Sequence, residues 1–291
     1  MRVDKPGIYE MSLADYVADP APQPSLNTGT ALTLLTQSPL HAKMQHVRLN
    51  PNAEREESSR ADLGTIAHAL LLEDDGSRVV EIDADDWRTK AAKEKRDEAR
   101  AAGKVPVLKK DYGTVREMVE VAQHFMMGSE LCNDWLSAKA ERTLVWNDGP
   151  GVWCRSRPDK LTDDGCVAFD YKTCGVSADP SVFARGVLIS NGYDLQAALA
   201  IRGVNALIKS RSCTFIFVCQ EIEPPYAVSL VSLSPQFLAI ANERLQAAVD
   251  MWGLCLETNR WPGYPARVAY ADAPAFYGME DLHAKMQNLS S

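Results

Sequence analysis

The sequence predicts one α/β domain whose N-terminal portion is mainly helical. Three short runs rich in β-forming residues, RTLVWN, VWCRSRP and CVAFDYK, follow one another from residue 141 and are separated by the turn sequences DGPG and TDDG. Turns this close together indicate an antiparallel meander. Two helical stretches, two more strands and a long amphipathic helix come next. This order predicts a mixed central sheet that contains the meander and is flanked by helices.

Helical patterns dominate the first half of the chain. Residues 1–24, which include ADPAPQPS, are expected to be an irregular lead-in, and a single domain is expected over residues 25–265. In its mainly helical part, residues 25–140, DLGTIAHALLLED carries apolar residues at helical spacing and RVVEID predicts a short strand. The basic segment at residues 88–110 and the following DYGTVREMVEVAQHFMMGS both predict helices.

The α/β core is expected over residues 141–265. After the three β runs, SVFARGVLI and YDLQAALAIRGVNALI predict helices, whereas CTFIFVCQE and YAVSLVSLS predict strands. The last helix is expected from Pro235 to about Arg260. Residues 266–291 are expected to form a C-terminal tail.

The composition excludes several classes of protein. No apolar run approaches the roughly 18–20 residues that a membrane span needs, and the N-terminus MRVDKPGIYEMSLADYVADP lacks the apolar core of a signal peptide. We therefore expect a cytoplasmic protein without a membrane partner. Seven cysteines are present without any C-x-x-C pair, which argues against structural zinc and against a disulfide framework. The net charge of −8 argues against indiscriminate coating of nucleic acid, but not against local contact.

The stretch RPDKLTDDGCVAFDYKTC, residues 157–174, places charged residues within an apolar strand. Alternate residues of a strand share a face, so Asp170 and Lys172 lie together. If TDDG closes a hairpin with a loop of two or four residues, Asp159 lies opposite Ala168 and joins that face. An odd loop length would break this parity.

Two carboxylates and a lysine on one face favour a site for a divalent cation. Two carboxylates this close repel each other, which raises the pKa of one of them unless a cation lies between them. Mg²⁺ takes one or two carboxylates and completes its shell with water and phosphate, and Mn²⁺ is a possible substitute. A nearby lysine can orient or deprotonate the attacking water. The alternative is a surface ion-pair cluster, which is common on sheets with one wet face.

The same residues carry a resemblance to a nuclease family. RPDK and DYKT, with eleven residues from Asp159 to Asp170, resemble the PD-(D/E)xK signature, and GTIAHALLLE, AERTLVW and YDLQAALA agree with it in order. With SPLHAK and KAAKEKRDEARAAGK added, the chain resembles the RecE-type exonucleases of phages and prophages (exonuclease VIII). These are relatives of the RecB nuclease domain and lambda exonuclease. The resemblance covers about residues 25–260.

This resemblance implies a PD-(D/E)xK fold and a set of metal ligands. Asp159 and Asp170 would bind the metal together with the backbone carbonyl of Tyr171. His68 would be a further ligand from its helix, as in RecB-like sites. No iron–sulfur cluster is expected, because the chain has no late trio of neighbouring cysteines.

The resemblance also implies three further catalytic residues. Lys172 would position or activate the attacking water, Glu141 would lie near a second metal, and Gln196 would line the active site. The family often has a tyrosine four residues after this glutamine, where this chain has Ala200. That departure leaves the DNA contact at this position open.

The activity implied is a Mg²⁺-dependent exonuclease that digests linear double-stranded DNA from 5′ to 3′ in a bacterial or phage-infected cell. It would leave 3′ single-stranded overhangs for an annealing protein in recombination, and related enzymes form rings around the duplex. The alternatives are a Cas4-like or RecB-like nuclease of different polarity, and an inactive DNA-binding module of the same fold.

A basic window predicts where the DNA backbone would bind. Between residues 88 and 110 the chain has nine basic and three acidic residues. The ordinary explanation of such a run is a solvated helix face. A nuclease must neutralise backbone phosphates near its acidic centre. We therefore expect DNA contacts from the basic residues Lys90, Lys93, Lys95, Arg96, Arg100 and Lys104.

Overall fold

A five-stranded mixed sheet lies at the centre of the computed structural model, which describes residues 1–53, 63–72, 79–208 and 213–273. Strands β9 and β10 pair in parallel and the other neighbours are antiparallel. The order across the sheet is β11 (Val228–Val231), β10 (Thr214–Glu221), β9 (Val167–Cys174), β8 (Lys160–Leu161) and β5 (Lys139–Ala140).

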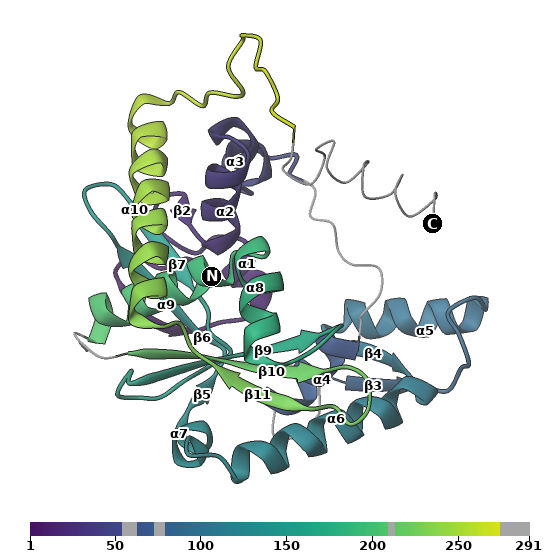
Figure 1. The fold of residues 1–291 in the computed structure, drawn as a ribbon. Helices are drawn as coiled ribbons and strands as arrows, with labels where there is room; N and C mark the ends of the chain where they lie inside the picture. Colours follow the sequence, from purple (N-terminus) through teal and green to yellow (C-terminus); the bar gives the residue numbers. More distant parts are fainter. Residues whose placement is uncertain (54–62, 73–78, 209–212, 274–291) are drawn as a thin grey trace, which may run out of the picture.

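Helices cover both faces of this sheet (Figure 1). One face, with Ala168 and Phe217, packs in the same core as α9 (Tyr193–Ile208), beside α8 (Pro180–Ser190) and α10 (Pro235–Thr258). The other face, with Phe169 and Val218, packs in a second core with α4 (Leu63–Leu72), α6 (Lys109–Met127) and α7 (Cys132–Ser137). The predicted mixed sheet flanked by helices is confirmed.

A second, four-stranded sheet corrects the expectation that residues 1–24 form an irregular lead-in. Its order is β1 (Gly7–Glu10), β6 (Arg142–Asn147), β7 (Trp153–Ser156) and β2 (Ser25–Leu26). The lead-in also contains a short helix, α1 (Leu13–Val17). Because β1 pairs along β6, the first residues are held by tertiary contacts that their own composition does not reveal.

The expected three-stranded meander is split between the two sheets. β6 and β7 form one hairpin, and β8 and β9 form another in the central sheet. The chain changes sheets around Pro158, which has no N–H to donate to a ladder. Within the second hairpin Leu161, and not Asp159, lies opposite Ala168. The register differs from the prediction by two residues, so the predicted parity holds.

A βαβ unit projects from the body of the molecule at the right of Figure 1. It consists of β3 (Val79–Ile82), α5 (Lys90–Ala101) and β4 (Val105–Leu108), with β3 and β4 parallel. The strand β3 and the helix α5 were predicted. The strand β4 was missed, because VPVL is short and lies between lysines that favour a solvated helix.

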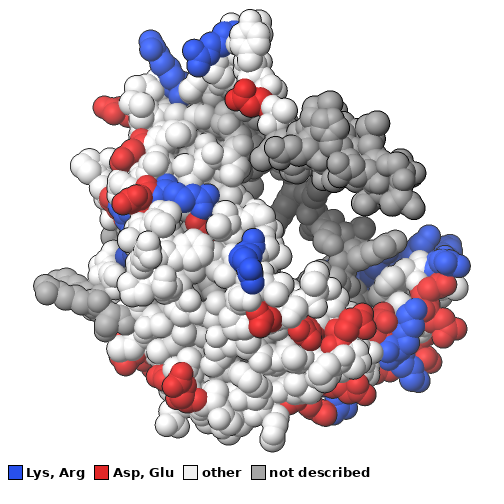
Figure 2. Space-filling model, viewed as in Figure 1, with Lys and Arg blue, Asp and Glu red and all other residues white. Residues whose placement is uncertain are grey.

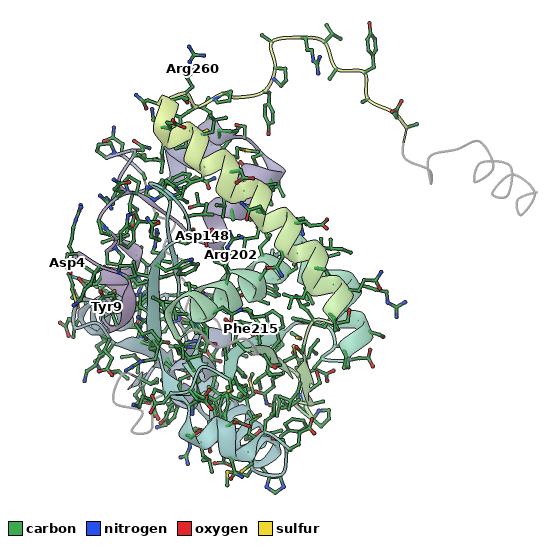
Figure 3. All side chains as sticks on the ribbon, turned by 90° about the vertical axis from the view of Figure 1, so that its left-hand side faces the viewer. Asp4, Tyr9, Asp148, Arg202, Phe215 and Arg260 are labelled. Carbon is green, nitrogen blue, oxygen red and sulfur yellow. The ribbon has the colours of Figure 1, made fainter. Side chains whose placement is uncertain are left out.

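The remaining helices pack beside α10. These are α2 (Thr28–Thr36) and α3 (Pro39–Gln45), whose Ser38 cap accepts a hydrogen bond from the His41 backbone N–H. Figure 3 shows α10 along its length, with Arg260 just beyond one end. Residues 266–273 of the expected tail are exposed, and residues 274–291 lie outside the described part. Among the described helices, none has both the length and the apolar character needed to cross a bilayer.

Candidate metal centre

Four segments far apart in the sequence bring polar side chains to one end of strand β9. Asp170 and Lys172 come from β9 itself, and Asp159 comes just before β8. His68 comes from α4, and Glu141 lies between β5 and β6. The hairpin parity places Asp159 and Asp170 on the same face of the sheet, as the sequence predicted.

Three of these side chains form a cluster with the spacing of a metal site. The Nε2 atom of His68 lies 2.9 Å from Asp159 Oδ1 and 3.9 Å from Glu141 Oε1. One ligand atom from each residue lies within 4.8 Å of the others. Oxygen atoms with a single imidazole nitrogen suit Mg²⁺ or Mn²⁺ better than a soft thiolate-binding metal.

The cluster is held in place by backbone hydrogen bonds. The Asp159 carboxylate accepts from the Tyr171 N–H (2.7 Å), and the Asp159 carbonyl accepts from the Glu141 N–H (2.9 Å). The Tyr171 side chain belongs to the opposite core, where its hydroxyl donates to Gln220. Tyr171 can therefore serve the centre only through its backbone, as the resemblance implies.

Asp170 is the most buried carboxylate of the site, with 1% of its surface exposed. One oxygen accepts a hydrogen bond from Gln196, and the other contacts the Lys172 ammonium but accepts no well-aligned hydrogen bond. Burial, helped by the charge of Asp159, raises the pKa of Asp170 to about 6. A buried carboxylate beside a second carboxylate fits a divalent cation, which would compensate the cost of its charge.

The protonation of the neighbouring groups follows from the same charges. Burial opposes the charged form of His68, but the hydrogen bond to Asp159 and the nearby carboxylates outweigh it and raise its pKa. Burial also opposes the charged form of Lys172, but the negative charges of Asp170 and Asp159 outweigh this effect and raise its pKa. Lys172 is therefore an ammonium group in the metal-free protein, suited to orienting a water molecule or stabilising negative charge.

Two residues to which the sequence assigned no role complete the site. The Tyr193 ring lies 4.6 Å from Lys172 Nζ, and Arg157 donates to the Glu141 carboxylate. Tyr193 stands three residues before Gln196 on α9, so helical spacing could have placed both on one face. Arg157 directly precedes the Pro-Asp pair, but nothing in the sequence indicates that it pairs with Glu141.

The six basic residues expected to bind DNA lie apart from this centre, on or just after α5. Lys90, Lys93, Lys95 and Lys104 are exposed, and Arg96 and Arg100 are half-buried. In Figure 2 blue side chains lie at the right of the molecule, next to red ones. Arg96 pairs with Asp97 at 2.9 Å, and Lys90 with Glu94 at 3.7 Å. Their role in DNA binding stays a prediction.

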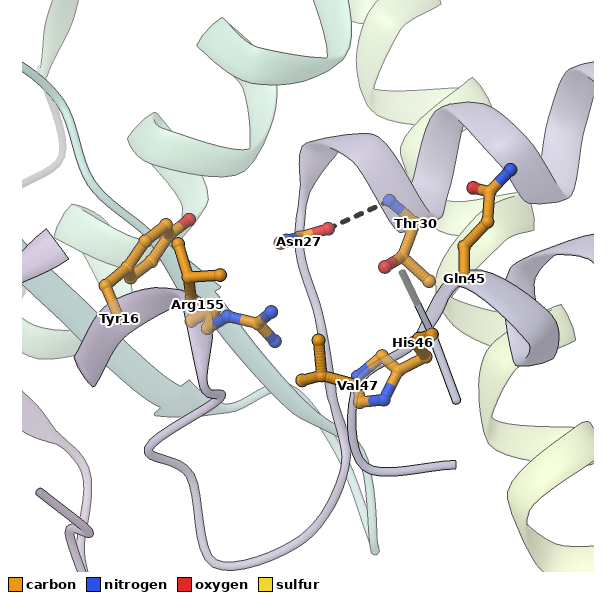
Figure 4. A pocket seen from close by; sticks show the side chains of 9 residues that line it. Tyr16, Asn27, Thr30, Gln45, His46, Val47 and Arg155 are labelled. Carbon is orange, nitrogen blue, oxygen red and sulfur yellow. Dashed lines mark hydrogen bonds between the residues drawn. The ribbon is translucent and has the colours of Figure 1, made fainter. Parts of the chain in front are cut away.

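A separate cavity of about 240 Å³ lies beside the N-terminal segment (Figure 4). Its buried guanidinium, Arg155, is paired with Asp19 at 3.2 Å and donates to the Ser25 carbonyl at 2.7 Å. His46 contacts the same carboxylate at 3.4 Å. This buried network connects β7 with the turn that precedes β2. A structural role therefore accounts for these charges.

Comparison with known proteins supports the fold. The model of a family described as a PDDEXK-like domain of unknown function (DUF3799) matches residues 30–274. The structure called Putative exonuclease, from Eubacterium rectale, superposes with a TM-score of 0.58 at 12% identity, covering 96% of this chain and 99% of that one. A phage related exonuclease from Haemophilus somnus 129PT aligns with a TM-score of 0.28 at 13% identity, over 67% and 95% of the two chains. No curated protein matches the chain.

The family match includes the five residues that meet at the candidate metal centre. His68, Glu141, Asp159, Asp170 and Lys172 all lie inside the matched range. At 12% identity, the structure from Eubacterium rectale supports the fold alone. The family match spans most of the 291 residues, and on this ground the chain belongs to the family of PDDEXK-like domains of unknown function (DUF3799).

Proposed function

We propose that the protein is a DNA exonuclease that uses Mg²⁺, or Mn²⁺ in its place, to hydrolyse phosphodiester bonds. The observation that carries this proposal is the convergence of Asp159, Asp170 and Lys172 on one face of the β8–β9 hairpin, beside His68 and Glu141. Asp170 is buried and its pKa is raised beside Asp159, a cost of charge that a bound divalent cation would offset.

Each side chain has a distinct part in the proposed reaction. When bound, the cation supplies positive charge to the scissile phosphate. Asp159, Asp170, His68 and the Tyr171 carbonyl would hold the cation, with Glu141 near a second one. The Lys172 ammonium would orient the attacking water and stabilise charge on the phosphate oxygens.

Supporting contacts fix the geometry of these groups. Gln196 donates to Asp170, which keeps that carboxylate turned toward the site. Arg157 donates to Glu141 and also to the Met11 carbonyl at 2.9 Å and to Thr143 Oγ1 at 2.7 Å. Contacts of this kind matter because misplacement by about 1 Å can cost roughly a hundredfold in rate.

The finer parts of the proposal are the direction of digestion and the partners. We propose 5′→3′ digestion of linear double-stranded DNA, which leaves 3′ single-stranded overhangs for an annealing protein in recombination. We also propose a ring-shaped homo-oligomer and contact of the basic helix α5 with the DNA backbone. The resemblance of the motifs to RecE-type exonucleases supports these parts, together with the exposure of the α5 lysines.

The test uses linear and circular duplexes labelled at either the 5′ or the 3′ end. We expect Mg²⁺-dependent, EDTA-sensitive loss of the 5′ label from linear DNA first, and no digestion of the circle. Asp170→Ala and Lys172→Ala should abolish cleavage while DNA binding persists. Full activity in either variant would contradict the proposed site, and first loss of the 3′ label would contradict the direction.

The same assay separates the alternative functions. An inactive DNA-binding module would bind the duplex at every Mg²⁺ concentration without digesting it. A nuclease of different polarity would digest linear DNA but release the opposite label. Visible absorption of the purified protein would indicate an iron–sulfur cluster and contradict the metal assignment.

A further inference from the structure

A large cavity lies at the β5 edge of the central sheet, on the face opposite the candidate metal centre. It has a volume of about 640 Å³ and is lined by the end of α4, by α6 and α7, by strands β5 and β8, and by Glu10 of β1. Ligand-binding clefts typically have volumes of about 300–1,000 Å³. The cavity is therefore large enough for a nucleotide.

The walls of this cavity combine apolar and cationic groups. Leu71, Leu72 and Trp135 form a buried apolar wall, and Lys139 and Lys160 stand at the polar side. This combination suits a nucleotide, because a base requires apolar contact and a phosphate requires cations.

Each lysine is held at the cavity by a contact that an added anion can share. Lys160 Nζ lies 4.4 Å from the centre of the Trp135 ring, and an ammonium group has three N–H donors, so it can serve several partners at once. Lys139 pairs with Asp163 at 2.9 Å, and both side chains are more than half exposed. Exposed pairs of this kind contribute only about 0–1 kcal/mol. The cavity carboxylate Glu10 is already paired with Arg142.

Residues that line this cavity are close in the sequence to residues of the metal centre. Ala140 precedes Glu141, Lys160 follows Asp159, and Leu72 is one helical turn after His68. Lys160 nevertheless lies opposite Phe169, on the sheet face away from Asp159 and Asp170. The cavity therefore cannot hold the scissile phosphate itself. A DNA strand would reach it by passing the edge strand β5, beyond which no other strand of the described ranges pairs.

We infer that this cavity binds a nucleotide of the cleaved strand adjacent to the one at the metal centre, an inference that rests on the proposed nuclease function. Its phosphate lies against Lys139 and Lys160, and its base lies against Leu71 and Leu72. The subsite holds the strand in line with the metal centre.

The experiment compares substitutions that keep or remove the charge at one position. Lys160→Met keeps an apolar stem over Trp135 but removes the charge, whereas Lys160→Arg keeps the charge. Arg260→Met, at the far end of α10 (Figure 3), is the control for general loss of charge. Affinity for a fluorescent linear duplex is measured by anisotropy in EDTA over a range of salt concentrations, and KM and kcat are measured with Mg²⁺.

We expect Lys160→Met to weaken binding about fivefold and to reduce the slope of log affinity against log salt by roughly 0.7–0.9. Its KM should rise more than its kcat falls, whereas Lys160→Arg should keep most of the affinity and the salt slope, and Arg260→Met should match the wild type. Wild-type affinity and salt slope in Lys160→Met, with Mg²⁺-dependent cleavage intact, would overturn the subsite alone. Wild-type protein that digests no DNA would instead overturn the proposed function.

The base contact has its own test in the wild-type protein. Duplexes that carry one abasic nucleotide, moved stepwise from the digested end, should show a single position at which loss of the base weakens binding. Equal affinity across the series would overturn the apolar part of the subsite.

Discussion

Gly64 on α4 lies directly against Thr173 on β9, so closely that a side chain at Gly64 would overlap it. A Cβ atom there would lie 3.3 Å from both Cβ and Cγ2 of Thr173, and its closest contact would be the hydroxyl oxygen. Gly64 is one helical turn before His68, and Thr173 follows Lys172. The missing side chain therefore sets the distance between the helix of His68 and the strand of Asp170.

The first prediction is that Gly64→Ala lowers cleavage by moving α4 away from β9. Displacement of His68 should reduce kcat about 10- to 100-fold, because an ångström of misplacement is costly. Overpacking should also lower the free energy of unfolding by about 1–3 kcal/mol. Kinetics at saturating Mg²⁺ and a denaturant titration would measure both changes.

A second substitution and a matched control sharpen this test. Gly64→Ala with Thr173→Ala should recover part of the missing activity, since the double variant removes the overlapping atoms. Gly113→Ala, on α6 where nothing lies within 4 Å, should stabilise the protein by about 0.5–1 kcal/mol and leave cleavage unchanged. Equal kcat for Gly64→Ala and the wild type would contradict the positioning role of Gly64.

The second prediction concerns the pH dependence of metal binding. The pKa of Asp170 is raised to about 6 by burial and by Asp159, whereas an aspartate in an unfolded chain titrates near about 3.9. The metal-free fold therefore binds this proton more strongly than the unfolded chain, and it loses this stabilising contribution as the pH rises from about 4 to about 6. Since a cation requires the deprotonated carboxylate, its affinity should fall about tenfold per pH unit below about 6.

The measurement is the shift in Tm on addition of Mg²⁺ at pH 5 and at pH 8. The wild type should gain several degrees at pH 8 and little at pH 5. Asp170→Asn should gain little at either pH, because it offers no charged ligand. An equal gain at both pH values in the wild type would contradict the role of Asp170 in binding the cation.

The third prediction concerns the ring beneath Lys172. Tyr193→Phe keeps the ring at 4.6 Å from the ammonium and should retain most of the activity, whereas Tyr193→Leu removes the ring. A cation–π contact contributes about 0.5–2 kcal/mol, so kcat of Tyr193→Leu should fall roughly 3- to 30-fold. If both variants cleave DNA at the wild-type rate, the ring has no part in positioning Lys172.

The candidate site was more predictable than the details of the fold around it. Asp159, Asp170 and Lys172 could be placed on one face because strand parity survives any even change of register, and the observed register differs by two residues. His68, Glu141 and Gln196 required the resemblance, since their partners are distant in the sequence. Each of their contacts depends on tertiary packing that local patterns do not encode.

The errors in the fold have the same physical origin. β1 was missed because four residues of GIYE carry too little pattern, and only pairing with β6 makes them a strand. The meander was expected in one sheet because the turn sequences fit it, but Pro158 interrupts the ladder between β7 and β8. Asp19 and Arg155 gave no signal either, since a buried ion pair depends on two segments meeting in space.

The fourth prediction tests the basic helix α5. Replacement of Lys93, Lys95, Arg96 and Arg100 by alanine should weaken DNA binding and flatten its salt dependence, because the slope falls by roughly 0.9 for each phosphate of duplex DNA that the protein no longer neutralises. The charge-conserving control exchanges lysine and arginine at the same four positions and should bind as the wild type does. Both variants keep Ala92 and Ala99, the buried residues of α5, which packs against β3 and β4, so both should fold. Salt-dependent anisotropy with a linear duplex distinguishes the outcomes: affinity unchanged at every salt concentration in the alanine variant would place the DNA-binding face elsewhere and leave α5 as a solvated helix.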